Sequence, residues 1–398
     1  MSDFKYVTLE EVTSRIKVGF VGSINDFYCS SEDGVPIIRT TDINDIDFNK
    51  LKFVTNEFHL KNKKSQLKKG DLIIARHGDN GNAVIYEHDQ IAQVLNAVII
   101  EPDQDQCSSD LLKIFFDSPF IKKQISGCVK GSVQGVINTK HIADLFLNIS
   151  GNIDYDFVIN TIKNISRKIA LNNKINTELE AMAKLIYDYW FVQFDFPDAN
   201  GKPYKSSGGK MVYNEELKRD IPEGWGSEYI ENLLAKESRT KKLHKTHYKD
   251  QGDYAIIDQS TDFICGYTDD KDTVIEAKVP RIVFGDHTRI LKLVNFDFAR
   301  GADGTQVLLS NNNNVPQHFF YHSLLKIDLA SYGYARHFKF LKQTRTIVPD
   351  ANTANQFEEA ATSFYSQVRH NIFETKRLEE LRDWLLPMLM NGQVRVKS

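Results

Sequence analysis

The sequence predicts an α+β fold in which two mixed α/β globules are separated by two long helices that form an antiparallel coiled coil. Three observations predict it. Short apolar runs of β type fill two stretches of the chain, a long helical pattern follows each stretch, and the two helical patterns match each other. The chain therefore uses one plan twice, as an internal pseudo-twofold repeat.

Residues 1–150 make up the first predicted globule. The runs at 71–75 (DLIIA) and 97–100 (AVII) are rich in Ile and Val and indicate buried strands. Polar turn residues, as in the segment 79–82 (DNGN), separate such runs. This alternation of short strands and turns is typical of a compact, sheet-containing domain.

The first spacer helix is predicted at 151–194 and a central linker at 195–223. The linker begins with FPDANGKPYKSSGGK, whose Pro, Gly and Ser content predicts little structure of its own. An aromatic run precedes and enters it: Tyr187, Tyr189, Trp190, Phe191, Phe194 and Phe196. These rings fit either an exposed contact surface or side chains buried where the helix meets the next globule.

The second half of the chain repeats this order. Short β-type runs return at 224–350, which we predict as the second globule. Residues 351–398 are predicted as the second spacer helix and a C-terminal tail.

A heptad seam runs along each helix, with apolar or polar residues spaced alternately by four and three. Its central members in the first helix are Ile165, Ile169, Asn172, Asn176 and Leu179. In the second helix they are Val368, Asn371, Thr375 and Leu378, which lie 199 residues after the last four of these. Each helical pattern of about 33 residues is roughly 50 Å long at 1.5 Å per residue. Matched phase and length predict that the two helices pair.

The polar seam residues bear on the direction of this pairing. An antiparallel pair places Asn172 beside Thr375 and Asn176 beside Asn371, and buried polar layers of this kind specify register. A parallel pair also matches the layers, but the position of the globules favours the antiparallel one. The alternative is that each helix packs on its own globule with its asparagines at the surface.

Candidate contact residues follow a buried strand or a glycine turn in each globule, where a rigid sheet projects a loop outward. Their types suit base edges and phosphates of DNA. They are Arg76, His77, Asn80, Ser132 and Gln134 in the first globule, and His287, Thr288, Arg289, Tyr334, Arg336 and His337 in the second. Taken singly, each also suits an ordinary solvent-facing turn.

The overall charge is not typical of a DNA-binding protein. Fifty basic and 53 acidic residues give a net charge of −3, whereas duplex-binding domains are commonly basic. Affinity for DNA therefore has to come from local basic surfaces. Two clusters qualify, although such clusters are often only solvated faces: Lys61, Lys63, Lys64, Lys68 and Lys69, and Lys241, Lys242 and Lys245 with His244 and His247.

Several functional classes are excluded by what the sequence lacks. The four scattered cysteines form no CxxC pair, so neither a disulfide framework nor a zinc site is expected. No apolar run approaches the roughly 20 residues of a membrane span, and MSDFKYVTLEEV has no signal-peptide core, so a cytoplasmic location is expected. The sequence contains no amino-methyltransferase tetrapeptide, phosphate-binding loop or HExxH motif. We therefore expect a chain without catalytic activity, cofactor or metal of its own.

Three segments resemble the specificity subunits of type I restriction–modification systems. They are KLIYDYWFVQFDFPDANGKPYKSSGGKMVYNEELKRDIPEGW at 184–225, VPRIVFGDHTRILKLVNFDFARGADGTQVL at 279–308, and RLEELRDWLLPMLMNGQV at 377–394. The resemblance covers nearly the whole chain and is weakest in residues 1–60.

The resemblance implies that each globule is a target recognition domain for one half of a split site in double-stranded DNA. The helices would set the gap, since roughly 50 Å matches about 15 base pairs at 3.4 Å per pair. They would also dock two modification subunits that carry S-adenosylmethionine, while restriction subunits would supply ATP- and Mg-dependent activity. Two alternatives remain: an orphan DNA-binding protein without a methyltransferase partner, and a structural coiled-coil interaction protein.

Overall fold

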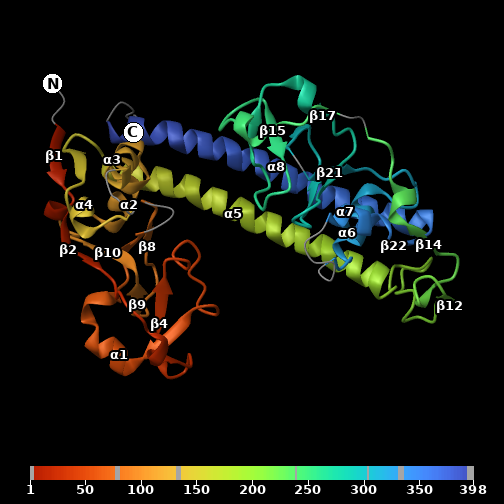
Figure 1. Cartoon of the computed structure of the whole chain (residues 1–398), viewed down its shortest axis with the longest axis horizontal. Coiled ribbons are helices and arrows are strands. Elements are labelled where there is room, and N and C mark those ends of the chain that lie inside the picture. Colours follow the sequence, from red (N-terminus) through yellow and green to blue (C-terminus); the bar gives the residue numbers. More distant parts are fainter. Residues whose placement is uncertain are drawn as a thin grey trace. The chain divides into compact units, whose positions relative to one another are not determined.

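The computed structural model describes residues 4–76, 81–130, 136–237, 240–302, 304–329 and 336–391. The chain divides into two compact units, of which unit 1 comprises residues 1–168 and 377–398 and unit 2 comprises residues 169–376. Each unit combines β-sheets with helices, so the predicted mixed α/β content is confirmed (Figure 1).

The described residues of unit 1 form three sheets. The first joins β1 (Phe4–Thr8) to β11 (Phe146–Ser150), and the second has the order β2 (Thr13–Val18), β10 (Ala97–Pro102), β7 (Leu72–Ala75), β8 (Ala83–Ile85). The third has the order β3 (Tyr28–Cys29), β5 (Lys52–Thr55), β4 (Gly34–Arg39), β9 (Ala92–Leu95), β6 (Gln66–Leu67). All pairs are antiparallel except β4 with β9.

The central strand β7 is buried on both faces, which explains its unbroken apolar sequence. Leu72 and Ile74 point into one core cluster and Ile73 into another, because successive side chains of a strand point to opposite faces. The neighbouring strand β10 divides its side chains between the same two clusters. The sheet is therefore an internal layer of unit 1.

Four helices pack around these sheets: α1 (Asn56–Lys61), α2 (Ser109–Asp117), α3 (Pro119–Lys130) and α4 (Thr139–Ala143). Side-chain caps fix where three of them begin, among them α2 and α4. The hydroxyl of Ser108 accepts from the backbone N–H of Leu111, and the amide oxygen of Asn138 accepts from that of His141. The apolar face of α2 closes the core beside β7.

In unit 2 the part of the chain that the structure describes forms four sheets. Two are pairs, β12 (Met211–Asn214) with β13 (Arg219–Pro222) and β14 (Gly226–Tyr229) with β22 (Arg345–Val348). A four-stranded sheet has the order β16 (Gly266–Thr268), β15 (Tyr254–Ile257), β20 (Phe298–Arg300), β17 (Val274–Ile275). A three-stranded sheet has the order β19 (Leu291–Val294), β18 (Arg281–Gly285), β21 (Thr305–Leu308). Helices α6 (Gln317–Leu325) and α7 (His337–Lys342) complete the unit.

The strand connections of unit 1 recur in unit 2. The first and last strands of each globule pair antiparallel, as β1 with β11 and β14 with β22. Each globule also has one parallel pair, β4 with β9 and β15 with β20. Strand β18 repeats the two-sided burial of β7, since Ile282 and Phe284 enter one cluster and Val283 another. The repeat that the helices indicate thus extends to the sheets.

Two long helices follow the globules, α5 (Tyr155–Tyr187), which continues into a π-helical turn at Asp188–Val192, and α8 (Ala351–Met390). Within unit 2 they lie side by side (Figure 1). Nδ2 of Asn172 donates to Oε2 of Glu374 at 2.7 Å and to Oγ1 of Thr375 at 3.4 Å.

One turn further along α5, the second polar layer follows. Nδ2 of Asn371 donates to Oδ1 of Asn176 at 2.8 Å. From Asn172 to Asn176 the residue number rises along α5, whereas that of the partner on α8 falls from Thr375 to Asn371. The two helices are therefore antiparallel in this stretch. Asn172 is 0% and Asn371 2% exposed, which excludes the alternative with both asparagines at the surface.

The other seam residues follow the same face. Val368 is buried and Thr375 is half-buried, and Ile169 and Leu179 are half-buried between exposed neighbours in unit 2. In unit 1, Ile165 and Leu378 are likewise half-buried. There the first turns of α5 and the last turns of α8 enter a common core, through Val158 and Ile162 and through Leu386 and Leu389.

The aromatic run at the end of α5 is mostly interior. Tyr187, Phe191, Phe194 and Phe196 are buried in the main core of unit 2, Trp190 is half-buried, and Tyr189 is exposed. Of the two interpretations of this run, burial against the globule therefore applies to most of its rings.

The expectation that the segment after α5 has little structure of its own is wrong. Phe196 stacks on Trp225, with 4.9 Å between ring centroids, and on Tyr204, with 4.6 Å. The Pro, Gly and Ser content predicted little structure, but these three rings bury one another and hold the segment in place. The hairpin of β12 and β13 follows directly.

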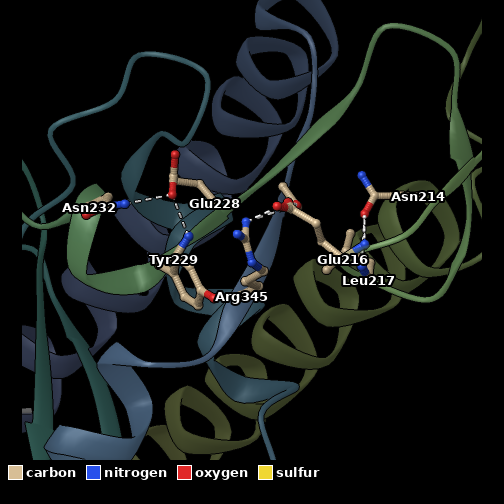
Figure 2. A network of polar contacts seen from close by, with 8 residues as sticks. Asn214, Glu216, Leu217, Glu228, Tyr229, Asn232 and Arg345 are labelled. Carbon is tan, nitrogen blue, oxygen red and sulfur yellow. Dashed lines mark hydrogen bonds and ion pairs between the residues drawn. The ribbon is translucent and has the colours of Figure 1, made fainter.

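A polar network ties this hairpin to the sheet of β14 and β22 (Figure 2). Nη1 of Arg345 donates to Oε2 of Glu216 at 2.6 Å, and the same guanidinium lies over the ring of Tyr229 at 3.9 Å. The carboxamide oxygen of Asn214 accepts from the backbone N–H groups of Glu216 and Leu217, which fixes the turn. The ion pair between Arg345 and Glu216 therefore anchors the hairpin, and stacking on Tyr229 positions the guanidinium of Arg345.

We predict an acid-sensitive core in unit 2 at His322, which is buried against Tyr187 and hydrogen bonded to the hydroxyl of Tyr365. Burial, with a smaller effect of His318, lowers the pKa of His322 to about 3. Because the unfolded chain takes up a proton near pH 6.5 and the folded chain does not, stability is lost as the pH falls below that value. The loss from this group is about 2 kcal/mol between pH 6.5 and 5.

Chemical unfolding of the protein and of His322→Gln at several pH values measures this contribution. The free energies of unfolding of the two proteins should converge as the pH falls. Parallel curves for the two proteins would contradict the assignment.

Candidate nucleic-acid interface

The turn after β18 presents three of the predicted contact residues to solvent. Residues 286–290 connect β18 to β19, and the turn is closed by hydrogen bonds from Gly285 N to Ile290 O and from Arg289 N to Gly285 O, both 2.8 Å. His287, Thr288 and Arg289 are exposed. The strand behind them is buried on both faces, so the turn has a rigid base.

Arg289 has a left-handed backbone conformation, with φ of 63°. For a residue with a side chain this conformation costs about 1 kcal/mol or more. A glycine would avoid that cost, so the presence of an arginine here is consistent with a functional use of its side chain.

A neighbouring loop holds this turn from one side. Oε1 of Gln259 accepts from the backbone N–H of His287 at 3.2 Å, and the backbone oxygen of Gln259 accepts from the hydroxyl of Thr288 at 2.7 Å. Gln259 follows β15 after a single residue, so a second buried strand positions the turn. Gln259 is not among the contact residues predicted from the sequence, although its place just after an apolar run was a usable signal.

His337 has a different role from the one predicted. It is 2% exposed, and both its backbone N–H and its Nδ1 lie 3.0 Å from the backbone oxygen of Asp286. Direct contact with DNA is therefore corrected to support of the turn from below. A histidine after a glycine turn has the same local sequence in either role, and only the packing of α7 distinguishes them.

A hollow of about 540 Å³ adjoins the turn in unit 2. It brings together the turn, the loop after β15 and the second basic cluster, which are distant in sequence. Its lining residues are His244, Lys245, Thr246, Tyr248, Asp258, Gln259, Ser260, Thr288 and Ala302. Two groups of candidates that the sequence suggested separately thus share one surface.

The rim and floor of this hollow differ in charge. Lys245 and His244 lie at exposed positions on its rim, whereas Asp258 is buried. Burial opposes the ionisation of Asp258, but hydrogen bonds from Cys265 and Ser260 outweigh it and lower the pKa of Asp258 to about 2. The hollow therefore has a cationic rim and an anionic floor at neutral pH.

A buried lysine stiffens the floor. Nζ of Lys292, on β19, donates to the backbone oxygen of Asp258 at 2.9 Å and also to that of Asp262. Burial lowers the pKa of Lys292, and the carboxylates of Asp258 and Asp262 oppose this effect. The loop that carries Gln259 is thus bound from within the core.

The remaining candidates of the second globule lie around this surface or outside the described residues. Lys241 and Lys242 are exposed, and Nζ of Lys241 lies 3.2 Å from Oδ2 of Asp270. Arg336 is exposed at the start of α7. Tyr334 lies outside the described residues.

In the first globule the described part of the site is small. Arg76 follows β7, and its Nε donates to the backbone oxygen of Ile137 at 3.3 Å. In the first lysine cluster, Lys61 pairs with Glu57 and Lys69 with Asp89, all exposed. His77, Asn80, Ser132 and Gln134 lie outside the described residues.

A second surface is apolar and lies on the outer side of each long helix. On α5, in unit 2, Met182, Leu185 and Tyr189 are exposed, with Leu185 at 69%. On α8, in unit 1, Leu381 and Trp384 are exposed, with Trp384 at 57%. Each pair of equivalent positions is 199 residues apart, the interval of the seam. We call these surfaces the outer stripes.

Within the ranges that the structure describes, no group of three or more His, Cys, Asp or Glu side chains is placed to hold a metal ion. In the same ranges no helix is both long and apolar enough to cross a bilayer.

The fold of the chain is similar to that of a solved protein. Over its whole length the chain superimposes on 97% of the type I restriction–modification S subunit from M. genitalium, with a TM-score of 0.53 and 11% sequence identity. At this identity the likeness concerns the fold. No family model matches the chain.

Relatives in sequence are more specific. The HindI specificity subunit of Haemophilus influenzae is 23% identical, and the alignment covers 99% of this chain and 100% of that protein. The MjaIX specificity subunit of Methanocaldococcus jannaschii is 25% identical over 56% of this chain and about half, 55%, of its own length. The EcoBI specificity subunit of Escherichia coli is 28% identical over 29% of this chain and 25% of that subunit.

All three relatives are specificity subunits of type I restriction enzymes. The resemblance drawn from residues 184–225, 279–308 and 377–394 is therefore confirmed, and the chain is related to type I specificity subunits.

The strained turn generates a prediction that separates stability from binding. Replacing Arg289 by Gly removes the left-handed strain, so the free energy of unfolding should stay unchanged or rise by up to about 1 kcal/mol. Binding of a target duplex should weaken by about 1–3 kcal/mol if the guanidinium contacts a guanine.

Thermal unfolding and titration with duplexes altered in one half-site measure both effects. The loss should be confined to one half-site. An equal loss for changes in both halves would assign Arg289 to phosphate contact or to the fold.

Proposed function

We propose that this chain is the DNA-specificity subunit of a type I restriction–modification enzyme. In this proposal the globules at 1–150 and 224–350 are target recognition domains, each reading one half of a split site in double-stranded DNA. The helices at 151–194 and 351–398, joined through 195–223, pair antiparallel along their length and set the gap between the halves.

One observation carries the proposal beyond the relationship in sequence: the two globules repeat one strand plan, and in each an arginine follows the central strand buried on both faces. Arg76 follows β7, and Arg289 lies in the turn after β18. Two similar surfaces on one chain suit a target with two separate halves, as dimeric readers suit two half-sites. The basic rim in unit 2 suits the phosphates beside the bases.

The chain itself is proposed to carry out no chemistry. Its partners would be two modification subunits with S-adenosylmethionine, which methylate adenine, and restriction subunits that use ATP and Mg. This division agrees with the absence from the sequence of the motifs for methyl transfer and phosphate binding. We further propose that the complex acts in the cytoplasm, where its DNA target lies.

The outer stripes support the docking of two copies of one partner. Exposed apolar side chains at helical spacing mark interaction surfaces, and these recur at one interval on α5 and α8. Met182, Leu185 and Tyr189 correspond to Leu381, Trp384 and Met388. Each stripe would receive one modification subunit.

The function is tested by mapping methylated adenine across the genome of a host that lacks its own adenine methyltransferases. The host expresses this chain with the modification subunit encoded beside it. A motif of two short defined halves with a fixed gap is the expected result. A soluble complex that contains cofactor but yields no motif would contradict the proposal and favour an orphan DNA-binding protein or a structural protein.

The docking surfaces give a separate prediction. Leu185→Asp and Trp384→Asp should each remove one of the two modification subunits, because a carboxylate in an apolar interface weakens binding by about 100-fold. The double variant should lose both subunits. Native mass spectrometry of the purified complex counts the subunits directly.

Leu60→Asp is the matched control, since Leu60 on α1 is 64% exposed and outside the stripes. It should leave the assembly complete. If the two stripe variants keep both modification subunits, docking does not use these side chains.

A further inference from the structure

The loop after β15 packs closely against three glycines. Gly285, at the end of β18, and Gly301 and Gly304, both in the connection between β20 and β21, approach the step from Asp258 to Gln259. A Cβ on Gly301 would lie 2.5 Å from Cβ of Asp258, and one on Gly304 would lie 2.7 Å from Nε2 of Gln259. A Cβ on Gly285 would lie 2.9 Å from Cβ of Gln259. Three positions without a side chain thus let the backbone close around one glutamine.

The carboxamide of Gln259 is oriented by this packing. Its Oε1 accepts from the backbone N–H of His287 at 3.2 Å, and the hydroxyl of Thr288 is bound to its backbone oxygen. A side chain that reads a base has to be held by its surroundings in one geometry. Gln259 meets that requirement at the wall of the hollow, beside the turn that carries Arg289.

The charge layout of the hollow determines which part of a duplex can approach Gln259. The anionic Asp258 on the floor repels phosphate, whereas Lys245 and His244 on the rim attract it. A base edge with an amino group is the part of DNA that an anionic floor favours, which means adenine or cytosine. Glutamine pairs with adenine by donating to N7 and accepting from the N6 amino group.

We propose that Gln259 is a specificity-determining residue that reads an adenine in the half-site of the second globule, with Lys245 at an adjacent phosphate. This inference rests on the proposed function and adds to it a base and the residue that selects it. In the complex, Nε2 donates to adenine N7 and Oε1 accepts from N6, while Oε1 keeps its bond to the turn.

The test uses the complete complex of this chain with its modification subunits. Binding is measured for the target duplex and for every single base-pair substitution in both halves. The proteins compared are the unaltered complex, Gln259→Glu and the control Gln251→Glu, which alters an exposed glutamine of the same globule outside the hollow. A carboxylate cannot donate to adenine N7 but accepts from cytosine N4.

The expected result is a change at one position of one half-site. The unaltered complex prefers adenine there, and Gln259→Glu lowers affinity for adenine about 10- to 100-fold and accepts cytosine. Gln251→Glu leaves every position unchanged. Gln259→Met, which is similar in size and uncharged, should also lose the preference at that one position. This variant excludes an effect of the charge that Gln259→Glu adds.

Three results would overturn the inference: no altered position, a uniform loss over both halves, or an altered position whose preferred base is not adenine. Thermal unfolding of each variant identifies a uniform loss that comes from misfolding. These failures leave the split motif of the unaltered complex intact, whereas failure of the proposed function removes the motif itself.

The phosphate contact is tested by Lys245→Gln. It should weaken binding to all duplexes alike and lower the slope of log affinity against log salt by about 1. A change of base preference in this variant, or an unchanged salt slope, would contradict the assignment of Lys245.

Discussion

The burial of a central strand on both faces is the constraint on which each globule depends. In β7 and in β18, alternate side chains fill two different clusters, so a shift of one residue would exchange every side chain between them. Register is therefore fixed, and the only parts of the strand left to face a ligand are its ends. Arg76 and the turn after β18 occupy those ends.

Around the turn of unit 2, rigidity comes from polar groups as well as from packing. Gln259 binds the turn, Lys292 binds the loop of Gln259, and His337 supports Asp286 from below. Buried hydrogen bonds to charged groups are among the stronger ones, and removing one partner leaves the other costly to bury. Asp258, whose backbone oxygen accepts from Lys292, also carries the negative charge on the floor of the hollow, so one residue takes part both in holding the loop and in setting the charge.

The features predictable from the sequence were those with a period. The seam at Asn172 and Asn176 and its counterpart on α8 follow from heptad spacing, and the buried strands follow from apolar runs. His337 was misassigned because the local sequence of a turn is the same whether its histidine points inward or outward. Gln259 was not selected although it follows an apolar run, because its close packing depends on three glycines brought together by folding, between 26 and 45 residues further along the chain. The order of the segment after α5 was not predicted for a related reason, since tertiary packing brings Phe196 onto Tyr204 and Trp225.

The core of unit 1 is completed by residues from opposite ends of the chain. Val158 and Ile162 of α5 share it with Leu386 and Leu389 of α8, and the intervening residues form unit 2. A ribosome makes the chain from its N-terminus, so the globule synthesised first is the last to acquire all of its core. Translation has to pass Leu389 before that globule is whole. A chain that stopped after residue 376 would contain the residues of unit 2 but would lack part of the interior of unit 1, and quality-control proteases recognise exposed apolar surface of that kind.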